Sequence, residues 1–273
     1  MIPSAGLRFY KMSGSGNDFV VVDAREDPHE ELRTPEMVRR LSARGTGVGS
    51  DGLVLITAEP GVDFRMIYYN ADGSRASMCG NAALCCTRLV TELGGGRPRE
   101  LRFATDSGVI VARIAGGQPA IDLAPVADVR RVAPVAPQAG EARIGFAIAG
   151  VPHLTVMVSD VSAADVLGRG RDLRHAPEVG PAGANTNFVS RDAGGWAMRT
   201  YERGVEDETL ACGTGAVASA ILIESWGLAT TPIALRTRSG RTLTVSLRRD
   251  GDAWLPTLAG EGRIVFSGEL LEL

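Results

Sequence analysis

Two stretches of sequence decide the fold: SMCGNAALCCTRLV (Ser77–Val90) and LACGTGAVASAILI (Leu210–Ile223). Each has a cysteine directly before a glycine, at the start of a long apolar run. The first stretch carries one charged residue, Arg88, and the second carries none. Because a helix that is apolar all round must be buried on every side, we predict two central helices, over 79–93 and 212–226, each inside a wrap of strands.

The segments that lead into the two cysteines are also similar to each other. Aligned on the cysteines, MIYYNADGSRASMCG and MRTYERGVEDETLACG place a methionine, a tyrosine and the Cys-Gly pair in step, with one extra residue in the second copy. The two cysteines lie about half the chain apart, which indicates an internal duplication. We predict two domains: residues 1–117 form a lobe with Cys79, to which a C-terminal strand over 263–273 returns, and residues 118–262 form a lobe with Cys212.

Most of the remaining pattern is typical of strands. Glycine accounts for 34 of the 273 residues and separates short runs rich in valine, isoleucine, phenylalanine and tyrosine, as expected of strands joined by turns. A third helix is predicted over 35–43, where Thr34 can act as the N-cap and Pro35 occupies the first turn. The predicted strands cover 7–12, 19–23, 53–57, 64–69, 109–114, 154–158, 186–190, 197–201 and 243–247.

The bulk composition argues against several classes of protein. A formal net charge of -3 and a pI near 5.7 leave no basic surface for nucleic acid or for a membrane, so we expect a small-molecule partner. The sequence has neither an apolar window of about 18 residues nor a signal-peptide pattern, and we expect a cytoplasmic location. Four cysteines without zinc-site spacing predict neither a disulfide framework nor a metal site.

A cysteine at the start of a buried helix has a distinct chemical use. The helix amino terminus offers N–H groups and a positive dipole end, which bind anions and favour a thiolate, and the following glycine lets a ligand approach the backbone. If two such termini converge, a small acid can bind with its α-carbon between two sulfurs. One thiolate then removes the α-proton while the opposite thiol supplies a proton to the other face, which inverts the centre.

Six motifs together cover nearly the whole chain: KMSGSGNDFVVVD (11–23), GVGSDGLVLI (47–56), YNADGSRASMCGNAA (69–83), PHL (152–154), NTNFV (185–189) and YERGVEDETLACGTGA (201–216). These motifs resemble those of the diaminopimelate epimerase family, whose members are pyridoxal-independent amino-acid epimerases. The resemblance implies an α/β (α+β) fold of two pseudo-symmetric lobes, each a mainly antiparallel, β-barrel-like sheet around a central helix. It also implies interconversion of LL- and meso-diaminopimelate for lysine and peptidoglycan precursor synthesis, without a cofactor, by a homodimer.

The resemblance also implies a role for each site residue. Cys79 and Cys212 are implied as the two acid/base thiols, and His153 matches an accessory position near the first of them. The implied donors to the reacting carboxylate are Gly80, Asn81, Gly213 and Thr214. The residues implied to hold the substrate, particularly at its distal amino-acid end, are Asn17, Asn70, Asn185, Glu202 and Arg203.

Some of these residues also fit purely structural roles. Cys85 and Cys86, inside an apolar helix, are expected to be buried hydrophobes. Val151 and Leu84 depart from the usual family pattern and bear on affinity or specificity rather than on reaction type. The residues that a turn, a surface ion pair or a structural histidine would also explain are Asn17, Asn70, Glu202, Arg203 and His153.

Several other functions are compatible with some of these residues. Proline or hydroxyproline racemisation uses a similar fold and two thiols, but a small cyclic substrate would not need Glu202, Arg203 and several asparagines. A thiol hydrolase with His153 as base leaves the second cysteine unexplained, and a non-catalytic binding protein leaves both thiols without a role. A pyridoxal enzyme is disfavoured because Lys11 is the sole lysine in the chain.

Overall fold

The computed structural model describes residues 6–96 and 100–271, and the chain divides into two compact units. Unit 1 comprises Met1–Ile121 with Ala259–Leu273, and unit 2 comprises Asp122–Leu258. The expected boundary at Gly117 falls inside unit 1. The reason is that Gly116 and Gly117 both adopt positive φ (58° and 80°) and form a tight turn between two strands rather than a linker.

Unit 1 is a mixed sheet with two helices. Its elements are β1 (Leu7–Gly14), β2 (Asn17–Ala24), η1 (Glu30–Arg33), α1 (Pro35–Ser42), β3 (Gly52–Thr57), β4 (Phe64–Asn70), β5 (Arg75–Ala76), α2 (Gly80–Leu93), β6 (Leu101–Thr105), β7 (Gly108–Ala115), β8 (Gln118–Asp122) and β18 (Arg263–Leu270). The strands pair in the order β18–β1–β2–β3–β4–β6–β7, and β5 also pairs with β4. Of these pairings, β2–β3 and β4–β6 are parallel and the others antiparallel.

Unit 2 is built in the same way. Its elements are β9 (Val129–Arg130), β10 (Glu141–Ala149), β11 (Val151–Val158), η2 (Val161–Ala163), α3 (Gly168–Arg174), η3 (Pro177–Val179), β12 (Asn185–Asp192), β13 (Gly195–Glu202), β14 (Asp207–Thr209), α4 (Gly213–Ser225), β15 (Ile233–Arg236), β16 (Thr242–Asp250) and β17 (Ala253–Ala259). The strands pair in the order β9–β10–β11–β12–β13–β15–β16, and β14 also pairs with β13. Here β11–β12 and β13–β15 are the parallel pairings.

The two units therefore share one topology. In each, an antiparallel hairpin is followed by a parallel partner, an antiparallel partner and a second parallel partner, in the same order along the chain. A strand from outside this run, β18 in unit 1 and β9 in unit 2, pairs with the first strand of the hairpin. The prediction of two pseudo-symmetric, mainly antiparallel lobes is confirmed.

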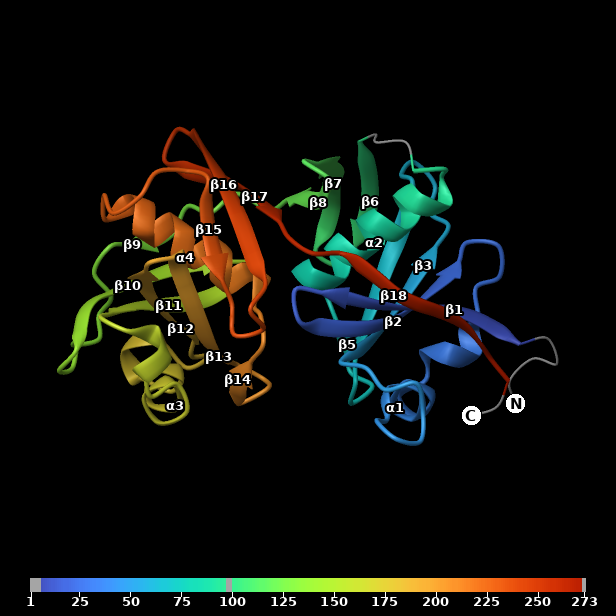
Figure 1. The fold of residues 1–273 in the computed structure, drawn as a ribbon, viewed down its shortest axis with the longest axis horizontal. Coiled ribbons are helices and arrows are strands. Elements are labelled where there is room, and N and C mark those ends of the chain that lie inside the picture. Colours follow the sequence, from blue (N-terminus) through green and yellow to red (C-terminus); the bar gives the residue numbers. More distant parts are fainter. Residues whose placement is uncertain (1–5, 97–99, 272–273) are drawn as a thin grey trace. The chain divides into compact units, whose positions relative to one another are not determined.

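The parallel pairings explain where the helices lie, because parallel strands need a crossover connection. α1 connects β2 to β3 and α3 connects β11 to β12, whereas α2 leads from β4 to β6 and α4 leads from β13 to β15. In unit 1, α2 contacts β1, β2, β4, β7 and β18, and in unit 2, α4 contacts β10, β11, β12, β15 and β16. Figure 1 shows each of these two helices flanked by the strands of its own unit.

The core of each unit follows from these positions. Every residue of α4 from Gly215 to Ile223 is buried, and α2 is buried without a break from Gly80 to Thr87, as their apolar composition predicts. The opposite face of the unit 1 sheet packs on α1, where Val20 lies in one cluster with Leu41. Strand β3 is buried along its whole length, because both faces of the sheet are covered.

Candidate active site

The two predicted catalytic cysteines occupy equivalent backbone positions. Cys79 is the N-cap of α2 (φ -135°, ψ 119°) and Cys212 is the N-cap of α4 (φ -133°, ψ 110°). Each cysteine carbonyl accepts the first intrahelical hydrogen bond, from the N–H of Ala83 and of Ala216, both at 2.9 Å. The earlier N–H groups of each helix have no intrahelical partner. These include the predicted donors Gly80, Asn81, Gly213 and Thr214.

In unit 1 the sheet brings chain-distant residues to one edge. β2 and β3 are parallel and β4 is antiparallel to β3, so the starts of β2 and β3 meet the end of β4. Asn17 begins β2, Asp51 directly precedes β3, and Asn70 ends β4. The side chain of Asn81, in the first turn of α2, donates to Asn17 Oδ1 at 2.6 Å. The amino end of α2, with Cys79, therefore lies at this edge.

Asp51 holds Asn17 from the other side. The amide Nδ2 of Asn17 donates to Asp51 Oδ2 at 3.2 Å, and the backbone N–H of Asp18 donates to the same oxygen at 3.1 Å. Asn81 is 2% exposed, and its Oδ1 has no hydrogen-bond partner within residues 6–96 and 100–271. A buried acceptor without a donor is costly, so Asn81 presents an oxygen that an N–H group of a ligand would satisfy.

Two basic side chains form ion pairs with aspartates at this edge. Lys11, buried in β1, contacts the Asp18 carboxylate and the carbonyl oxygen of Gly49. Arg44 donates to Asp18 at 2.6 Å and to Asp51 at 2.9 Å. Burial acts to raise the pKa of Asp18, but the hydrogen bonds from Arg44 and Lys11 outweigh it and lower the pKa below its usual value. The Asp18 carboxylate is therefore charged at neutral pH and anchors the two basic side chains.

Asn70 lies at the same edge but outside the Asn17–Asn81 pair. Its Nδ2 donates to Ser74 Oγ at 3.0 Å, within the turn that follows β4. The next residue, Ala71, donates its N–H to the carbonyl oxygen of Asp51 at 3.1 Å. The turn thus fixes Asn70 beside Asp51, and the predicted site role and the predicted turn role are compatible.

Unit 2 gathers its predicted residues in the same way. β11 and β12 are parallel and β13 is antiparallel to β12, so the starts of β11 and β12 meet the end of β13. His153 pairs with Asn185 between β11 and β12, Glu202 ends β13, and Arg203 follows it. The Asn185 side chain accepts from the backbone N–H of Arg203 at 2.7 Å. This edge of unit 2 corresponds to the edge of unit 1 that carries the asparagines.

Glu202 and Arg203 lie in different surroundings. Glu202 Oε2 accepts from Thr209 Oγ1 at 2.8 Å. Burial raises the pKa of Glu202, and the hydrogen bond from Thr209 offsets this only in part. Arg203 is half-buried, and its guanidinium donates to the carbonyl oxygen of Ala182 at 3.5 Å. Both side chains are half-buried, and a carboxyl group and a guanidinium with partial access suit an ammonium and a carboxylate group, respectively.

Two residues at these edges were not among those predicted. Asp51 lies in the motif GVGSDGLVLI, but in sequence it does not differ from an ordinary turn aspartate. Asn187 is fully buried, with Nδ2 at 3.2 Å from Nδ1 of His153. The signal that marks it is an amide within the apolar strand NTNFV, two residues after Asn185 and so on the same face.

The four cysteines are of two kinds. Cys85 and Cys86 are fully buried within α2, and burial raises the pKa of both thiols well above the ordinary value. They stay neutral and act as packing residues. Cys79 is half-buried, and Cys212 is 5% exposed with its Sγ 3.6 Å from Thr214 Oγ1. Cys79 and Cys212 differ from the two packing cysteines because each lies at a helix amino terminus.

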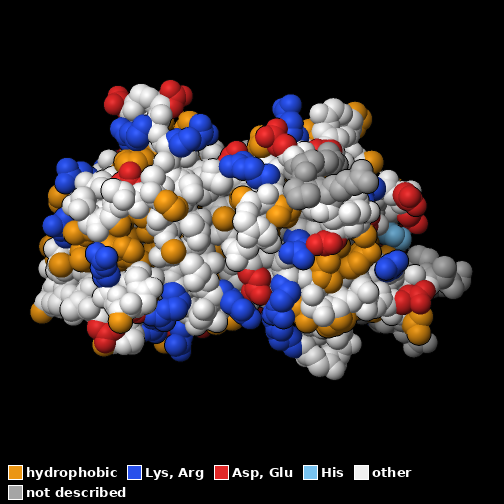
Figure 2. Space-filling model, turned by 45° about the horizontal axis from the view of Figure 1, so that its top comes forward, with side chains coloured by type: hydrophobic (Ala, Val, Ile, Leu, Met, Phe, Trp, Pro, Cys, Tyr) orange, Lys and Arg blue, Asp and Glu red, His pale blue; other side chains and the backbone are white. Residues whose placement is uncertain are grey.

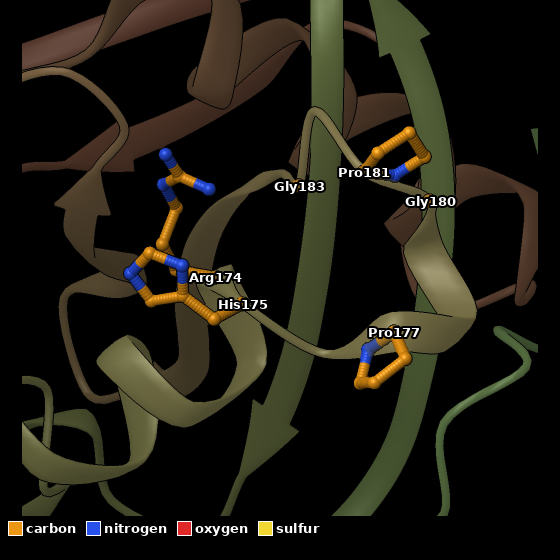
Figure 3. Close-up of a pocket in the computed structure, with 6 residues that line it drawn as sticks. All are labelled: Arg174, His175, Pro177, Gly180, Pro181 and Gly183. Carbon is orange, nitrogen blue, oxygen red and sulfur yellow. The ribbon is translucent and has the colours of Figure 1, made fainter.

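A cavity of about 360 Å³ lies elsewhere in unit 2. Figure 3 shows its lining residues, which lie at the end of α3, on η3 and in the loop that follows η3. The guanidinium of Arg174 donates to Glu206 at 3.0 Å and to Ala182 at 3.3 Å, so its charge is already balanced. Within the described part of unit 2, no predicted site residue lines this cavity, whose lining is Arg174, His175, Pro177, Gly180, Pro181 and Gly183.

Comparison with known proteins assigns the chain to a family. A sequence profile described as diaminopimelate epimerase matches residues 9–124 and 146–264. The chain belongs to the diaminopimelate epimerase family. The diaminopimelate epimerase of Gemmatimonas aurantiaca is 48% identical over 98% of this chain and 100% of its own length. That of Aquifex aeolicus is 41% identical over 97% of this chain and 98% of its own length.

Solved structures share the fold of this family member at lower identity. A phenazine biosynthesis protein of the PhzF family from Bacillus anthracis has a TM-score of 0.74 and 15% identity, over 97% of this chain and 99% of that one. A probable proline racemase from Agrobacterium radiobacter has a TM-score of 0.67 and 19% identity, over 97% of this chain and 92% of that one. At these identities the likeness concerns the fold.

The surface of this family member is mixed in charge. On the face drawn in Figure 2, basic side chains are interspersed with aspartate and glutamate side chains, in keeping with the small net charge of -3. In the described ranges, no helix combines the length and the apolar character needed to cross a membrane.

Proposed function

We propose that this protein interconverts LL-diaminopimelate and meso-diaminopimelate, with Cys79 and Cys212 as the two acid/base thiols. One observation carries the proposal: two cysteines cap two equivalent buried helices in duplicated units. The names of the relatives at 48% and 41% identity supply the substrate. The protein is then an isomerase of lysine and peptidoglycan precursor synthesis.

The reaction needs two groups that exchange roles. One thiolate removes the α-proton, so an S–H bond forms as the Cα–H bond breaks, and the electron pair delocalises into the substrate carboxylate. The other thiol gives its proton to the opposite face of the same carbon and becomes a thiolate. The configuration inverts, the numbers of protons and electrons are unchanged, and the enzyme is left ready for the reverse reaction.

The helix amino termini supply the electrostatic part of the scheme. As the α-proton leaves, negative charge grows on the substrate carboxylate. The first-turn N–H groups of α2 and α4 and the positive ends of the two helix dipoles stabilise that charge. Such donors act most strongly when they are fixed in advance and shielded from water, and the buried first turns meet both conditions. The scheme assigns no step to a cofactor.

The unreacting end of the substrate has its own ammonium and carboxylate groups. We assign Glu202 to the ammonium group and Arg203 to the carboxylate, because their charges and partial access suit these partners. The open Oδ1 of Asn81 is a further acceptor for a ligand N–H group. The amides assigned to the same substrate end are Asn17, Asn70 and Asn185.

Replacing each thiol tests the assignment. Cys79→Ala and Cys212→Ala are each expected to lower kcat for LL-to-meso conversion by about 1000-fold or more, with an unchanged circular dichroism spectrum. Cys86→Ala is the matched control, because it removes a buried thiol from the same helix as Cys79. Near-normal activity in either N-cap variant, or an equal loss in the control, would contradict the proposal. Conversion of proline instead of diaminopimelate would favour the racemase alternative.

We also propose a cytoplasmic homodimer. Reducing conditions in the cytoplasm keep both thiols available. Phe266 on β18 is 48% exposed beside Val265 at 47%, and it is the one aromatic among the exposed large apolar side chains of the described residues. A second copy that covers this strand would remove the apolar surface from water.

Light scattering tests the dimer. The wild-type protein is expected at twice the mass of the chain, and Phe266→Asp is expected to shift it toward the single chain. Val132→Asp is the control, because Val132 is 80% exposed and lies in unit 2. A wild-type protein that remains a single chain at micromolar concentration would overturn this part of the proposal.

A further inference from the structure

Three buried polar side chains on neighbouring strands of unit 2 lie on the face of the sheet that packs on α4. Thr155, Asn187 and Thr200 are neighbours on β11, β12 and β13, and each is at most 2% exposed. Thr155 Oγ1 lies 3.3 Å from Ser219 Oγ on α4. Buried polar groups persist where hydrogen bonds compensate their lost hydration. The pattern of these bonds therefore specifies how each member is oriented.

The hydrogen bonds of Asn187 determine which way its amide points. Nδ2 donates to the carbonyl oxygen of Leu154 at 3.0 Å, and Oδ1 accepts from Thr200 Oγ1 at 2.9 Å. The opposite orientation would set two acceptors against each other at Leu154. The same Nδ2 lies 3.2 Å from Nδ1 of His153. That ring nitrogen must accept, which leaves the imidazole proton on Nε2.

His153 is held neutral in this position. Its side chain is fully buried, and burial, with the positive charge of Arg203 as a further cause, lowers its pKa to about 3. Its Nε2 has no hydrogen-bond partner in the described ranges. A general base needs a ring nitrogen with a free lone pair. In His153 the proton is on Nε2 and Nδ1 already accepts a hydrogen bond, so the ring is not the general base that a thiol hydrolase requires. The Nε2–H group is therefore a hydrogen-bond donor that has no acceptor among the described residues.

This donor lies beside the amino end of α4. His153 and Thr155 share one face of β11, and Thr155 contacts α4, so His153 faces the helix nearer its start. Gly215 gives a second indication. A Cβ added there would collide with Asn187 Oδ1 and lie 3.2 Å from Cys212 Sγ. The amide, the imidazole and the thiol thus surround the first turn of α4.

We propose that Asn187 is a positioning residue that holds His153 as its neutral Nε2–H tautomer, and that this N–H donates to the reacting carboxylate of a substrate bound at the amino end of α4. The inference rests on the proposed function for the identity of the acceptor. Asn187 acts on the substrate only through His153. The two edges then differ: unit 1 offers an open amide oxygen at Asn81, and unit 2 offers an open N–H.

Nitrogen-15 NMR of histidine-labelled protein tests the tautomer without substrate. The His153 ring is expected to carry a proton on Nε2 and none on Nδ1, and to stay so between about pH 8 and about pH 5. His29→Gln and His175→Gln identify the other two histidine signals. Asn187→Asp should place a proton on Nδ1, because a carboxylate accepts a hydrogen bond from that nitrogen. If this variant does not fold, the wild-type spectrum alone decides the tautomer. A proton on Nδ1 in the wild type would overturn the inference.

Kinetics of two His153 variants test the donor role. Glutamine places an amide N–H near the position of Nε2, whereas asparagine places one near Nδ1. His153→Gln is expected to retain about tenfold more kcat/KM than His153→Asn, the worth of one hydrogen bond. Equal values or the reverse order would contradict the donor role. If the wild-type protein converts no diaminopimelate, the proposed function has failed, and the NMR spectrum still decides the tautomer.

Discussion

Glu202 is a carboxyl group in surroundings that oppose its charge. Because burial raises its pKa, the folded state favours the protonated form more than the unfolded state does. The contribution of Glu202 to stability is therefore fully present below the unfolded-state pKa, and it is lost as the pH rises through the higher folded-state pKa. Loss of stability at a side chain is a common cost of function, so the position of Glu202 at the edge shared with Asn185 agrees with the proposed binding role.

Glu202→Gln should separate these two effects. At neutral pH the variant is expected to have a higher Tm, since the buried charge is gone, and a kcat/KM about 10- to 100-fold lower, since an ammonium partner is lost. Thermal melts and steady-state kinetics measure them. Glu208→Gln is the control and should lower the Tm, because Glu208 pairs with Arg199 at 2.6 Å. A lower Tm in Glu202→Gln would contradict the account.

His153 should make stability depend on pH in the opposite direction. Its folded-state pKa of about 3 lies below the ordinary 6.5, so the unfolded state binds a proton first as the pH falls. Its stabilising contribution is present above about pH 6.5 and is lost progressively toward pH 3. The difference in unfolding free energy between wild type and His153→Gln should shrink by about 2 kcal/mol from pH 7.5 to pH 5. Urea titrations measure it, and a constant difference would refute the burial argument.

Asp51 should matter to activity through Asn17. Asp51→Ala removes the acceptor that holds the Asn17 amide, so kcat/KM is expected to fall about tenfold. Asp23→Ala is the matched control, because Asp23 lies near the other end of β2 and pairs with Arg25. Kinetics of the two variants decide: equal losses would show that Asp51 acts only through general stability.

At the scale of elements, the approach of β1 to α2 depends on one glycine. A Cβ at Gly14 would lie 2.7 Å from the carbonyl oxygen of Asn81 and 3.1 Å from Cys85 Sγ. The backbone of a buried helix cannot turn aside as a flexible side chain does. Because Gly14 has no side chain, the first turn of α2, with its N-cap thiol and the Asn81 amide, can lie this close to β1.

Gly14→Ala is expected to lower the free energy of unfolding by about 1–3 kcal/mol, the usual cost of overpacking, and to lower kcat/KM because the first turn shifts. Urea denaturation and kinetics provide the two values. At Gly194 the nearest atom to an added Cβ is an exposed Asp192 oxygen at 3.3 Å, so Gly194→Ala should change stability by less than about 0.5 kcal/mol. Similar losses at both positions would argue against the close approach.

Elements with a strong local signal could be predicted from the sequence, and elements decided by distant partners could not. The predicted helices at 79–93 and 212–226 agree with the structure within a residue or two, because an apolar run of this length is typical of a buried helix. α3 was missed, since GRGRDLR holds two glycines, which are poor helix formers. β6 and β15 were missed as well. Each is short and is placed by parallel pairing with β4 or β13.

At the scale of the whole molecule, the duplication explains why the predicted site residues form two sets. Each unit carries one N-cap thiol and one sheet edge of polar residues, produced by the same order of strand pairing. The motifs in the sequence predict that the thiols lie at helix starts and that several polar residues lie at the sheet edges, and the structure agrees with these positions. That these residues act on a substrate stays a prediction. The sequence could not predict Asp51 or Asn187, because their roles depend on hydrogen bonds to Asn17 and His153, which lie 30 or more residues away in the chain. The neutral state of His153 depends likewise on burial, which no local pattern reveals.

The central claim is that two thiols from duplicated units act on one α-carbon, and solvent isotope incorporation tests it most directly. Reduced wild-type protein would be given LL-diaminopimelate in deuterium oxide, and both isomers would be analysed at early times. The account predicts deuterium at the inverted centre of the meso product and hydrogen in the remaining LL substrate, because different groups serve the two faces. Deuterium entering the unreacted LL substrate as fast as it enters the product would mean that one base serves both faces, and would contradict the account.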